Sequence, residues 1–311
     1  MVGDEDHGAV LDRHRDSLRG RLRPLLPRLH VLPALSGQLD QWAEWLVRTR
    51  FAGCSDAEVE EALEELGRKR DRVLDGAQIR AGETVADVGA GTGLLALGAV
   101  SRVGPDGDVL AIDISVDALE ELRANTGAPN LSYLVGGAEV LPLMDEAVDA
   151  VVTRSVLIYV DDKVEAAREF HRVLRSDGRV SLFEPINSRN LRLYEALDLA
   201  PLGGLGERLR ARTDAAYANP DDPMLNFDES DLERFFAAAG FADVRLELGQ
   251  DEHEVQGERY LNQVGAPGRP TILQHWQEHF PEEDADRLAT FVRERTIPLR
   301  YPHAFLTARK P

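Results

Sequence analysis

The sequence predicts an α/β protein built on a mostly parallel, doubly wound sheet. From about residue 79 onward, short apolar runs alternate with helical segments, and this βαβα order is typical of such sheets. The first of these runs ends in the glycine-rich turn "GAGTG" and is followed by a helix. In open α/β sheets, ligands bind beside turns of this kind, at the carboxyl ends of the strands.

The residues before this alternation are predicted to be helical. The N-terminal stretch is interrupted by Pro24, Pro27 and Pro33. Two later helices have a plausible N-cap, Ser36 before Leu39, Trp42 and Leu46, and Ser55 before Val59, Leu63 and Leu66.

The elements of the alternating part follow from their apolar periodicity and their turn residues. The expected strands are 83–89, 108–115, 131–137, 147–155, 178–185, 242–249 and 303–310. The expected helices between them are 93–104, 116–127, 162–175, 228–241 and 281–296. The segment 186–227 is irregular, and about fifty residues after 249 are expected to be mainly helical.

Composition favours a small-molecule partner over a nucleic acid. Lys and Arg number 36 against 55 Asp and Glu, which gives a net charge of −19 that repels phosphate backbones. A neutral or cationic substrate fits this charge more easily. No apolar run reaches the roughly 18 residues that span a bilayer, the N-terminus lacks a signal-peptide pattern, and the single Cys54 forms no internal disulfide. We therefore expect a cytoplasmic protein without a membrane partner.

The glycine turn differs from the dinucleotide-binding fingerprint. That fingerprint has its third glycine at position six, where this chain has Leu94. Asp87 precedes the turn by two residues, and a carboxylate there suits a cationic or zwitterionic ligand better than a pyrophosphate. Asp113 ends the next strand, where an acid can bind the two hydroxyls of a ribose. NAD-dependent enzymes and methyltransferases share this last feature.

Four stretches, in order, resemble the successive motifs of class I S-adenosylmethionine-dependent methyltransferases. They are "VADVGAGTG", "VLAIDIS", "GGAEVLPLMDEAVDAVVTRSVLIYV" and "REFHRVLRSDGRVSLFEP", and they lie within residues 79–185. The resemblance is strongest to the branch that contains the ubiquinone/menaquinone biosynthesis methyltransferases. It implies a Rossmann-like, seven-stranded methyltransferase sheet, S-adenosylmethionine as cofactor, S-adenosylhomocysteine as product, and methyl transfer to a small molecule in secondary or cofactor metabolism.

The resemblance also implies roles for individual residues, by motif position. Around the methionine part of the cofactor it places Asp87, Gly89, Ala90, Gly91 and Gly93. At the ribose and adenine it places Asp113, Ile114, Ala138 and Glu139, and beneath the methionine end Arg154 and Ser155. Gly137 stands where relatives often have an acid that contacts adenine, so either Glu139 substitutes for it or the contact is lost. Ser176 and Asp177 also depart from the family pattern, in a turn.

The sequence does not assign a catalytic residue, because methyl transfer needs a base only when the nucleophile must lose a proton. Tyr159 is either a hydrogen-bonding partner of the substrate or a packed aromatic, and Glu184 is either a base or a cap for the next segment. Asn187, three residues after Glu184, is a weaker candidate for the same site. His171 lies on a predicted helix, where a structural role is the simpler interpretation.

Two further patterns have a structural and a functional interpretation. His275 and His279 have the spacing of a metal pair, but without a third ligand a solvated helix face is the simpler explanation, and no metal is expected. Trp42, Trp45 and Arg48 could close over the substrate, or the tryptophans could pack in the core.

The predicted organisation has four parts. They are an N-terminal helical cap (1–78), a cofactor-binding core (79–185), a substrate lid (186–227), and the remainder of the core with a helical insertion at about 250–300 (228–311). The added segments are expected to cover the carboxyl ends of the strands and form the acceptor pocket. The alternatives are an NAD-dependent oxidoreductase or a non-catalytic cofactor-binding protein, and monomer and homodimer both stay open.

Overall fold

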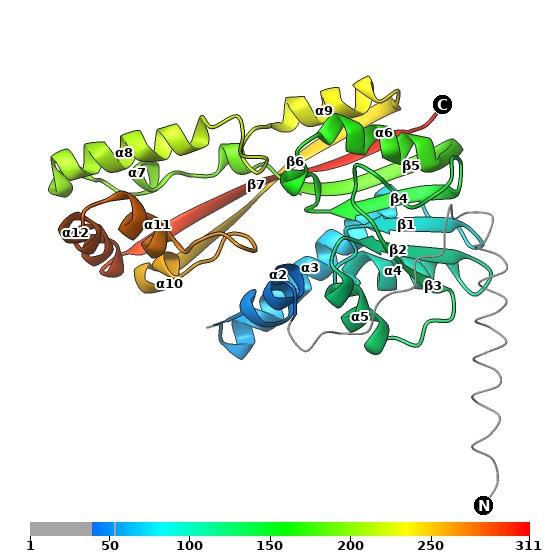
Figure 1. Cartoon of the computed structure of the whole chain (residues 1–311), viewed down its shortest axis with the longest axis horizontal. Helices are drawn as coiled ribbons and strands as arrows, with labels where there is room; N and C mark the ends of the chain where they lie inside the picture. The colour runs from blue at the N-terminus through cyan, green and yellow to red at the C-terminus, as the bar shows by residue number, and fades with distance from the viewer. Residues whose placement is uncertain (1–38, 53) are drawn as a thin grey trace, which may run out of the picture.

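The computed structural model describes residues 39–52 and 54–311. The expected proline-interrupted helical segment and the cap at Ser36 therefore lie outside the described residues. In the described part, the chain forms a seven-stranded sheet in the order β3-β2-β1-β4-β5-β7-β6 (Figure 1). The strands are β1 (Thr84–Val88), β2 (Asp108–Asp113), β3 (Leu131–Val135), β4 (Val148–Arg154), β5 (Leu174–Pro185), β6 (Ala242–Gln256) and β7 (Thr296–Arg309).

The first five strands are parallel, whereas β7 pairs antiparallel with both β5 and β6. Every residue of β1 is buried, as is typical of a parallel strand covered on both faces. The doubly wound, Rossmann-like sheet predicted from the βαβα order is confirmed.

Helices cover both faces of the sheet. The helices are α2 (Gln41–Glu44), α3 (Asp56–Gly76), α4 (Leu94–Val103), α5 (Val116–Ala124), α6 (Lys163–Val173), α7 (Leu193–Ala196), α8 (Gly204–Tyr217), α9 (Glu229–Ala238), α10 (Gly257–Leu261), α11 (Ile272–His279) and α12 (Glu282–Arg293). The π-helical turn η2 (Trp45–Thr49) continues α2, and short 3-10 turns are η3 (Leu157–Tyr159), η4 (Asn187–Arg189) and η5 (Ala200–Leu202).

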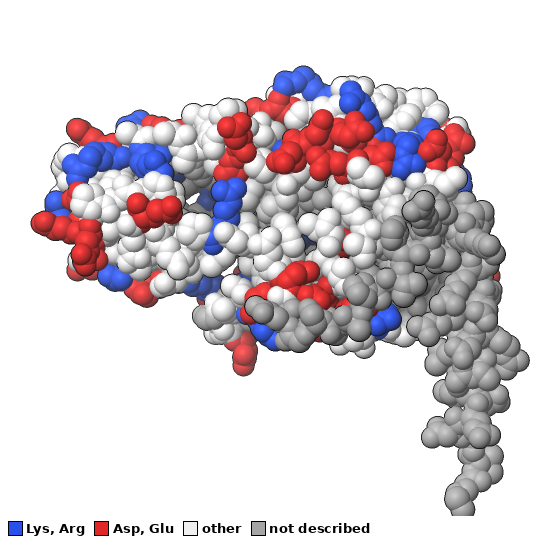
Figure 2. Space-filling model, viewed as in Figure 1, with Lys and Arg blue, Asp and Glu red and all other residues white. Residues whose placement is uncertain are grey.

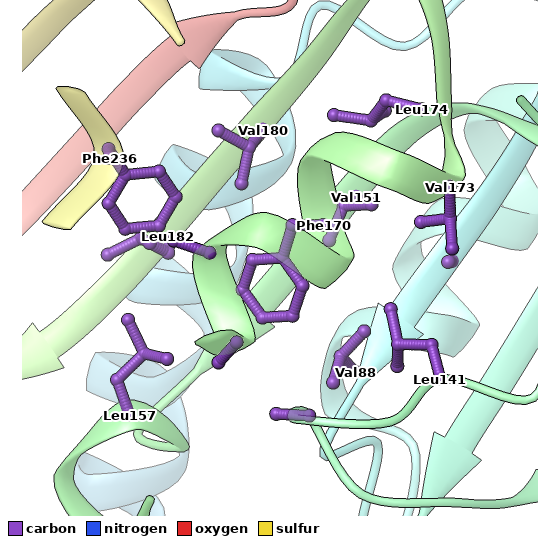
Figure 3. Packing of buried hydrophobic residues seen from close by; sticks show 14 of the residues in the cluster. Val88, Leu141, Val151, Leu157, Phe170, Val173, Leu174, Val180, Leu182 and Phe236 are labelled. Carbon is purple, nitrogen blue, oxygen red and sulfur yellow. The ribbon is translucent and has the colours of Figure 1, made fainter. Parts of the chain in front are cut away.

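Each face of the sheet has its own apolar core. Helices α3, α4 and α5 bury residues such as Leu74, Leu95 and Leu119 against one face. Helices α6 and α9 bury Phe170 and Phe236 against the other. Figure 3 shows the ring of Phe170 between its helix and the strands, among side chains of β1, β4 and β5.

The helix before the sheet begins at the predicted cap. The Ser55 side chain accepts from the Glu58 N–H, and the Glu58 carboxylate accepts from the Ser55 N–H, forming a capping box. In this helix Leu66 is buried, whereas Leu63 is 53% exposed. The described start of the preceding helix α2 is capped by Asp40.

Strands β6 and β7 are longer than the sequence pattern predicted. They form a hairpin that continues past the end of β5, down to the pair Gln256 and Thr296. The prolines Pro298 and Pro302 had hidden the outer part of β7, since proline is rare inside sheets. The pairing of β7 with β5 ends at His303 and Pro185. Pro298 and Pro302 come before His303, where β7 has no β5 neighbour, so the N–H that each proline lacks removes no hydrogen bond between these two strands.

The outer half of this hairpin carries a second structural unit, which we call the distal lobe. It consists of α7, α8, α10, α11, α12 and the outer ends of β6 and β7, and it extends away from the sheet (Figure 1). Its core includes Leu205, Trp276, Leu288 and Ile297, and this cluster is separate from the two clusters on the sheet. The helices of the predicted insertion at about 250–300 are α10, α11 and α12, and the outer ends of β6 and β7 occupy the two ends of that range.

Charge is unevenly spread over the surface. Acidic side chains form continuous stretches on one face of the sheet-bearing part, while acidic and basic side chains alternate over the distal lobe (Figure 2). Within residues 39–52 and 54–311, no helix combines the length and apolarity needed to cross a membrane.

Candidate functional site

A cavity of about 550 Å³ opens at the carboxyl ends of the parallel strands. Its floor is formed by the ends of β1, β2, β4 and β5 and the turns that follow them. Trp42, Trp45 and Leu46 contribute to one wall, and Tyr301 and His303 of β7 to another. This volume falls within the range typical of small-molecule sites.

The glycine turn has the geometry that its sequence predicts. Gly89 and Gly91 have positive φ of 72° and 51° and line the cavity. A Cβ on Gly89 would lie 2.1 Å from a Val156 methyl carbon, so a larger residue cannot fit there. Gly93 (φ 94°) begins α4 and packs on Leu122, so it shapes the turn without lining the cavity.

Asp113 holds the same turn in place. Its two carboxylate oxygens accept from the backbone N–H groups of Gly91 at 2.7 Å and Ser115 at 2.8 Å. Burial raises the pKa of Asp113, and the two backbone hydrogen bonds oppose that rise. The carboxylate therefore lies at the end of β2 beside the glycine turn, as the motif spacing predicted.

Asp87 is a buried carboxylate in need of a partner. Its side chain is on the cavity wall, yet the residue is only 1% exposed. Neither oxygen forms a hydrogen bond of ordinary geometry within the described chain, although the Ala96 N–H is close enough to favour the charged form. Burial raises the pKa of Asp87 from 3.8 to about 8. A cationic group delivered into the cavity would satisfy this carboxylate.

The proposed adenine side of the cavity contains Ile114, Ala138, Gly137 and Glu139. Ile114 is 56% exposed, and an apolar side chain in that position offers a surface on which a flat ring can pack. One Glu139 oxygen accepts from the Asp162 N–H at 2.9 Å. That contact ties Glu139 to the loop before α6.

Arg154 and Ser155 end β4 and both line the cavity. The Arg154 guanidinium lies 5.5 Å from the centre of the Phe183 ring, and its buried Nε has no hydrogen-bond partner in the described chain. Burial, and then the nearby charge of Arg50, lower the pKa of Arg154 to about 10. Ser155 has a positive φ of 54°, a strained backbone of the kind that gathers at functional sites.

The two catalytic candidates occupy different environments. Tyr159 lines the cavity, packs edge-on against Trp42 with ring centres 4.9 Å apart, and has its pKa raised to about 12, mainly by burial. Glu184 is fully buried and is not among the described residues of the cavity wall. Its carboxylate accepts from the backbone N–H groups of Val156, Leu157 and Ile158, which is the geometry of the capping alternative.

Buried in this way, Glu184 has a pKa raised to about 7, while its three backbone hydrogen bonds oppose the rise. Asn187 lines the cavity. His171, on α6, instead packs edge-on against Phe241, with ring centres 5.1 Å apart.

The segment before α3 contributes more to the cavity than the sequence indicated. Trp42 and Trp45 line it, but Arg48 faces solvent and pairs with Glu44 at 2.8 Å. Arg50, which the sequence analysis did not select, lines the cavity in place of Arg48. The π-helical turn η2 adds a residue to the helical repeat here and so changes which side chains face inward.

Further wall residues come from α3 and the hairpin, among them Glu65, Lys69, Asp251 and His303. Lys69 forms ion pairs with Glu65 and, at 2.5 Å, with Asp251. Asp251 also lies 3.4 Å from Nδ1 of His303. Sequence motifs could not find this group because its members are joined only by the pairing of β6 with β7 and the packing of α3.

No group of three or more His, Cys, Asp or Glu side chains in the described ranges is arranged to hold a metal ion. His275 and His279 stack on one another with ring centres 4.3 Å apart, in the distal lobe. The Cys54 sulfur accepts a hydrogen bond from Arg259.

Comparison with known proteins gives a consistent assignment. The family described as "Methyltransferase domain" matches residues 86–182. The ubiquinone/menaquinone biosynthesis C-methyltransferase UbiE of Vibrio campbellii is 30% identical over 179 residues, which are 55% of this chain and 69% of that protein. The chain belongs to the class I S-adenosylmethionine-dependent methyltransferases. This assignment decides against the oxidoreductase alternative and gives S-adenosylmethionine as the cofactor.

Other similar proteins differ in how much of the chain they match. An arsenite methyltransferase of Halobacterium salinarum is 30% identical over 154 residues, 43% of this chain, and the match spans only 39% of that protein's length. The solved structure of Bacillus subtilis YcgJ has a TM-score of 0.52 at 21% identity and covers 78% of this chain and 98% of its own. A Bacillus halodurans structure gives a TM-score of 0.53 at 20% identity, with coverage of 78% and 99%. These structures confirm the fold.

Proposed function

We propose that the methyltransferase binds S-adenosylmethionine along the ends of β1 and β2 and transfers its methyl group to a small molecule in the same cavity. The observation that carries this proposal is Asp87, a buried carboxylate without a partner in the wall of the cavity. The α-amino group of the cofactor's methionine is a cation of the kind that such a carboxylate binds.

The rest of the cofactor fits the same wall. Gly89, Ala90 and Gly91 let a ligand approach the backbone closely, and Asp113 is placed to accept from ribose hydroxyls. Ile114 and Ala138 offer apolar contacts for adenine, and Glu139 lies beside them. With Gly93 shaping the turn and Arg154 and Ser155 below it, these residues are the proposed cofactor site.

When bound, the cofactor supplies an electrophilic methyl carbon on a sulfonium, so the protein's task is to orient the acceptor and exclude water. Trp42, Trp45 and Leu46 cover the glycine turn, with the Leu46 Cδ1 only 3.0 Å from where a Cβ of Gly91 would lie. This cover limits access of water to the reacting centre. Tyr159 is placed to donate a hydrogen bond to the acceptor, and its raised pKa keeps it protonated at neutral pH.

We propose a small-molecule acceptor because the cavity has a volume of about 550 Å³ and more of its accessible wall is apolar than polar. UbiE takes part, by its name, in ubiquinone and menaquinone biosynthesis, and its similarity to this chain supports an acceptor in cofactor or secondary metabolism. Residues of the inserted segments reach the same cavity, including Met224 and Gly265, and we propose that they select the acceptor.

Titration calorimetry with S-adenosylmethionine, S-adenosylhomocysteine and NAD tests the cofactor assignment of the cavity. We expect the first two to bind the full chain and NAD not to bind. Asp87→Asn should weaken S-adenosylmethionine at least about tenfold, or ~1.4 kcal/mol, while Asp106→Asn, at an exposed turn, should not. Wild-type affinity in the Asp87→Asn protein would contradict the proposed site. Release of S-adenosylhomocysteine with candidate acceptors tests turnover and excludes the non-catalytic alternative.

A further inference from the structure

The charged groups of the cavity wall divide into those with partners and those without. The wall contains five carboxylates, Glu65, Asp87, Asp113, Glu139 and Asp251, and three cationic side chains, Arg50, Lys69 and Arg154. Lys69 is held between two of the carboxylates, and two others accept backbone N–H groups. The groups left over are Asp87, Arg50 and Arg154.

Both arginines line the cavity and form no ion pair within the described part of the chain. Arg50 lies over the faces of Trp45 and Phe51, at 5.5 and 5.4 Å from the ring centres. Arg154 contacts the Phe183 ring, and the charge of Arg50 is close enough to lower its pKa. Neither guanidinium has an ion pair or a hydrogen bond to a carboxylate in the described part of the chain. Glu184 and Glu65 lie near enough to Arg154 to oppose the fall in its pKa, but neither forms an ion pair with its guanidinium, and Glu184 accepts from three backbone N–H groups instead.

The proposed cofactor leaves one of these arginines without a partner. Its ammonium pairs with Asp87, and its single carboxylate can neutralise one guanidinium. The other guanidinium then remains in a partly buried cavity beside a sulfonium that carries a further positive charge. Uncompensated charges in such surroundings are costly, so the remaining site favours an anion.

Resting on the proposed function, we infer that the methyl acceptor of this protein carries an anionic oxygen group, a carboxylate or a phosphate, which pairs with Arg50 or Arg154. Trp42, Tyr159 and Met224 line the same cavity, so the body of the acceptor is apolar or aromatic. Arginine binds both anions with paired N–H donors.

The net charge of −19 favours a neutral or cationic substrate, whereas the arginines of the cavity favour an anionic one. Charges at the outer surface are screened by salt over roughly 10 Å, whereas two unpaired guanidinium groups act at contact distance. The local arrangement therefore decides what binds, and the surface charge affects only how fast an anion arrives.

The test is a binding measurement on the full chain saturated with S-adenosylhomocysteine, so that the cofactor's own carboxylate is already in place. The probes are phenylacetate, phenyl phosphate and the uncharged phenylacetamide, followed by calorimetry and by the fluorescence of the wall residues Trp42 and Trp45. Arg50→Gln and Arg154→Gln are the test variants. Arg48→Gln is the matched control, because Arg48 is on the same segment but faces solvent.

We expect at least one anionic probe to bind about tenfold or more tightly than the amide. One of the two test substitutions should remove this preference and leave S-adenosylhomocysteine affinity unchanged, and Arg48→Gln should change neither. Equal binding of anion and amide, no binding of any probe, or substitutions that affect only S-adenosylhomocysteine would overturn the inference. Failure of the wild-type chain to bind S-adenosylhomocysteine would instead overturn the proposed function, and the inference with it.

Discussion

The buried Asp87 predicts that cofactor binding is coupled to the loss of a proton. With a pKa of about 8, this carboxyl is mostly protonated at pH 7 before the ligand arrives. The incoming ammonium group favours the charged carboxylate, so the proton must leave when the two pair. Binding should therefore release a proton, and the affinity for S-adenosylmethionine should rise with pH.

The size of the effect follows from this pKa. The ionised fraction of Asp87 is about 1% at pH 6 and about 10% at pH 7, so the affinity should rise about tenfold between these values. Near pH 7, each bound ligand should release about 0.9 proton from this group. The range stops at pH 7 because the ligand's own amino group loses its proton near pH 8.

Calorimetry in two buffers of different ionisation enthalpy measures the released protons directly. The variant Asp87→Asn should bind more weakly and show no release from this site. Asp113 is the neighbouring titratable group, and burial raises its pKa as well. Asp113→Asn should weaken binding and still release a proton, because Asp87 is intact. A flat affinity from pH 6 to 7, or unchanged proton release in Asp87→Asn, would refute this account.

The free energy of unfolding should fall as pH rises, whereas the affinity for the cofactor should increase. The folded pKa of Asp87 lies above its unfolded value of 3.8, so the folded state holds a proton that the unfolded chain has lost. The stability present below pH 3.8 is therefore lost progressively as pH rises toward 8. Asp87→Asn carries no such proton and should resist urea better than the wild type at pH 7, by up to about 4 kcal/mol. A destabilised variant would show that weaker binding reflects misfolding.

Three further substitutions test the packing described above, each by urea unfolding followed by circular dichroism. Phe170→Ala should lose about 3–5 kcal/mol of unfolding free energy, because the fully buried ring leaves a cavity between α6 and the sheet; a loss below about 1 kcal/mol would contradict the observed packing. Arg179→Gln should cost about 3–5 kcal/mol, since it leaves Glu83 in a poorly solvated site without its ion pair, and a neutral effect would show that the pair is dispensable. Gly257→Ala should destabilise the distal lobe by about 1–3 kcal/mol, because its Cβ would lie 1.8 Å from the Val292 carbonyl oxygen, and limited proteolysis should then cut the lobe before the core.

The parts of the fold that follow from local sequence were predicted correctly. The strands β1 to β4 are short, apolar and bounded by turn residues, and the capping box at Ser55 is visible in the sequence itself. Strand β5 begins at Leu174, earlier than its predicted start at residue 178 and within the end of the predicted helix 162–175. The outer hairpin was missed for a physical reason. Strand β6 is largely exposed, and in β7 Pro298 and Pro302 argue against a strand unless one knows that β5 has already ended.

The residues of the candidate site likewise fall into those that sequence motifs identify and those that only the three-dimensional structure identifies. Residues contiguous with a motif, such as Asp87 and Asp113, are found where their spacing places them. Arg50 was missed because a π-helical turn changes the helical register, and nothing in the sequence announces that turn. His303 was missed because it reaches the cavity through an antiparallel strand from the far end of the chain.

The separate core of the distal lobe has a consequence for how this protein can vary. Its apolar cluster shares no residue with the two clusters that hold the sheet, although the lobe is joined to the sheet part both by the hairpin and by the chain on either side of α7 and α8. Substitutions in the core of the lobe can accumulate while the cofactor half keeps its packing. Such a division lets a lineage acquire a new acceptor without rebuilding the part that activates the methyl group.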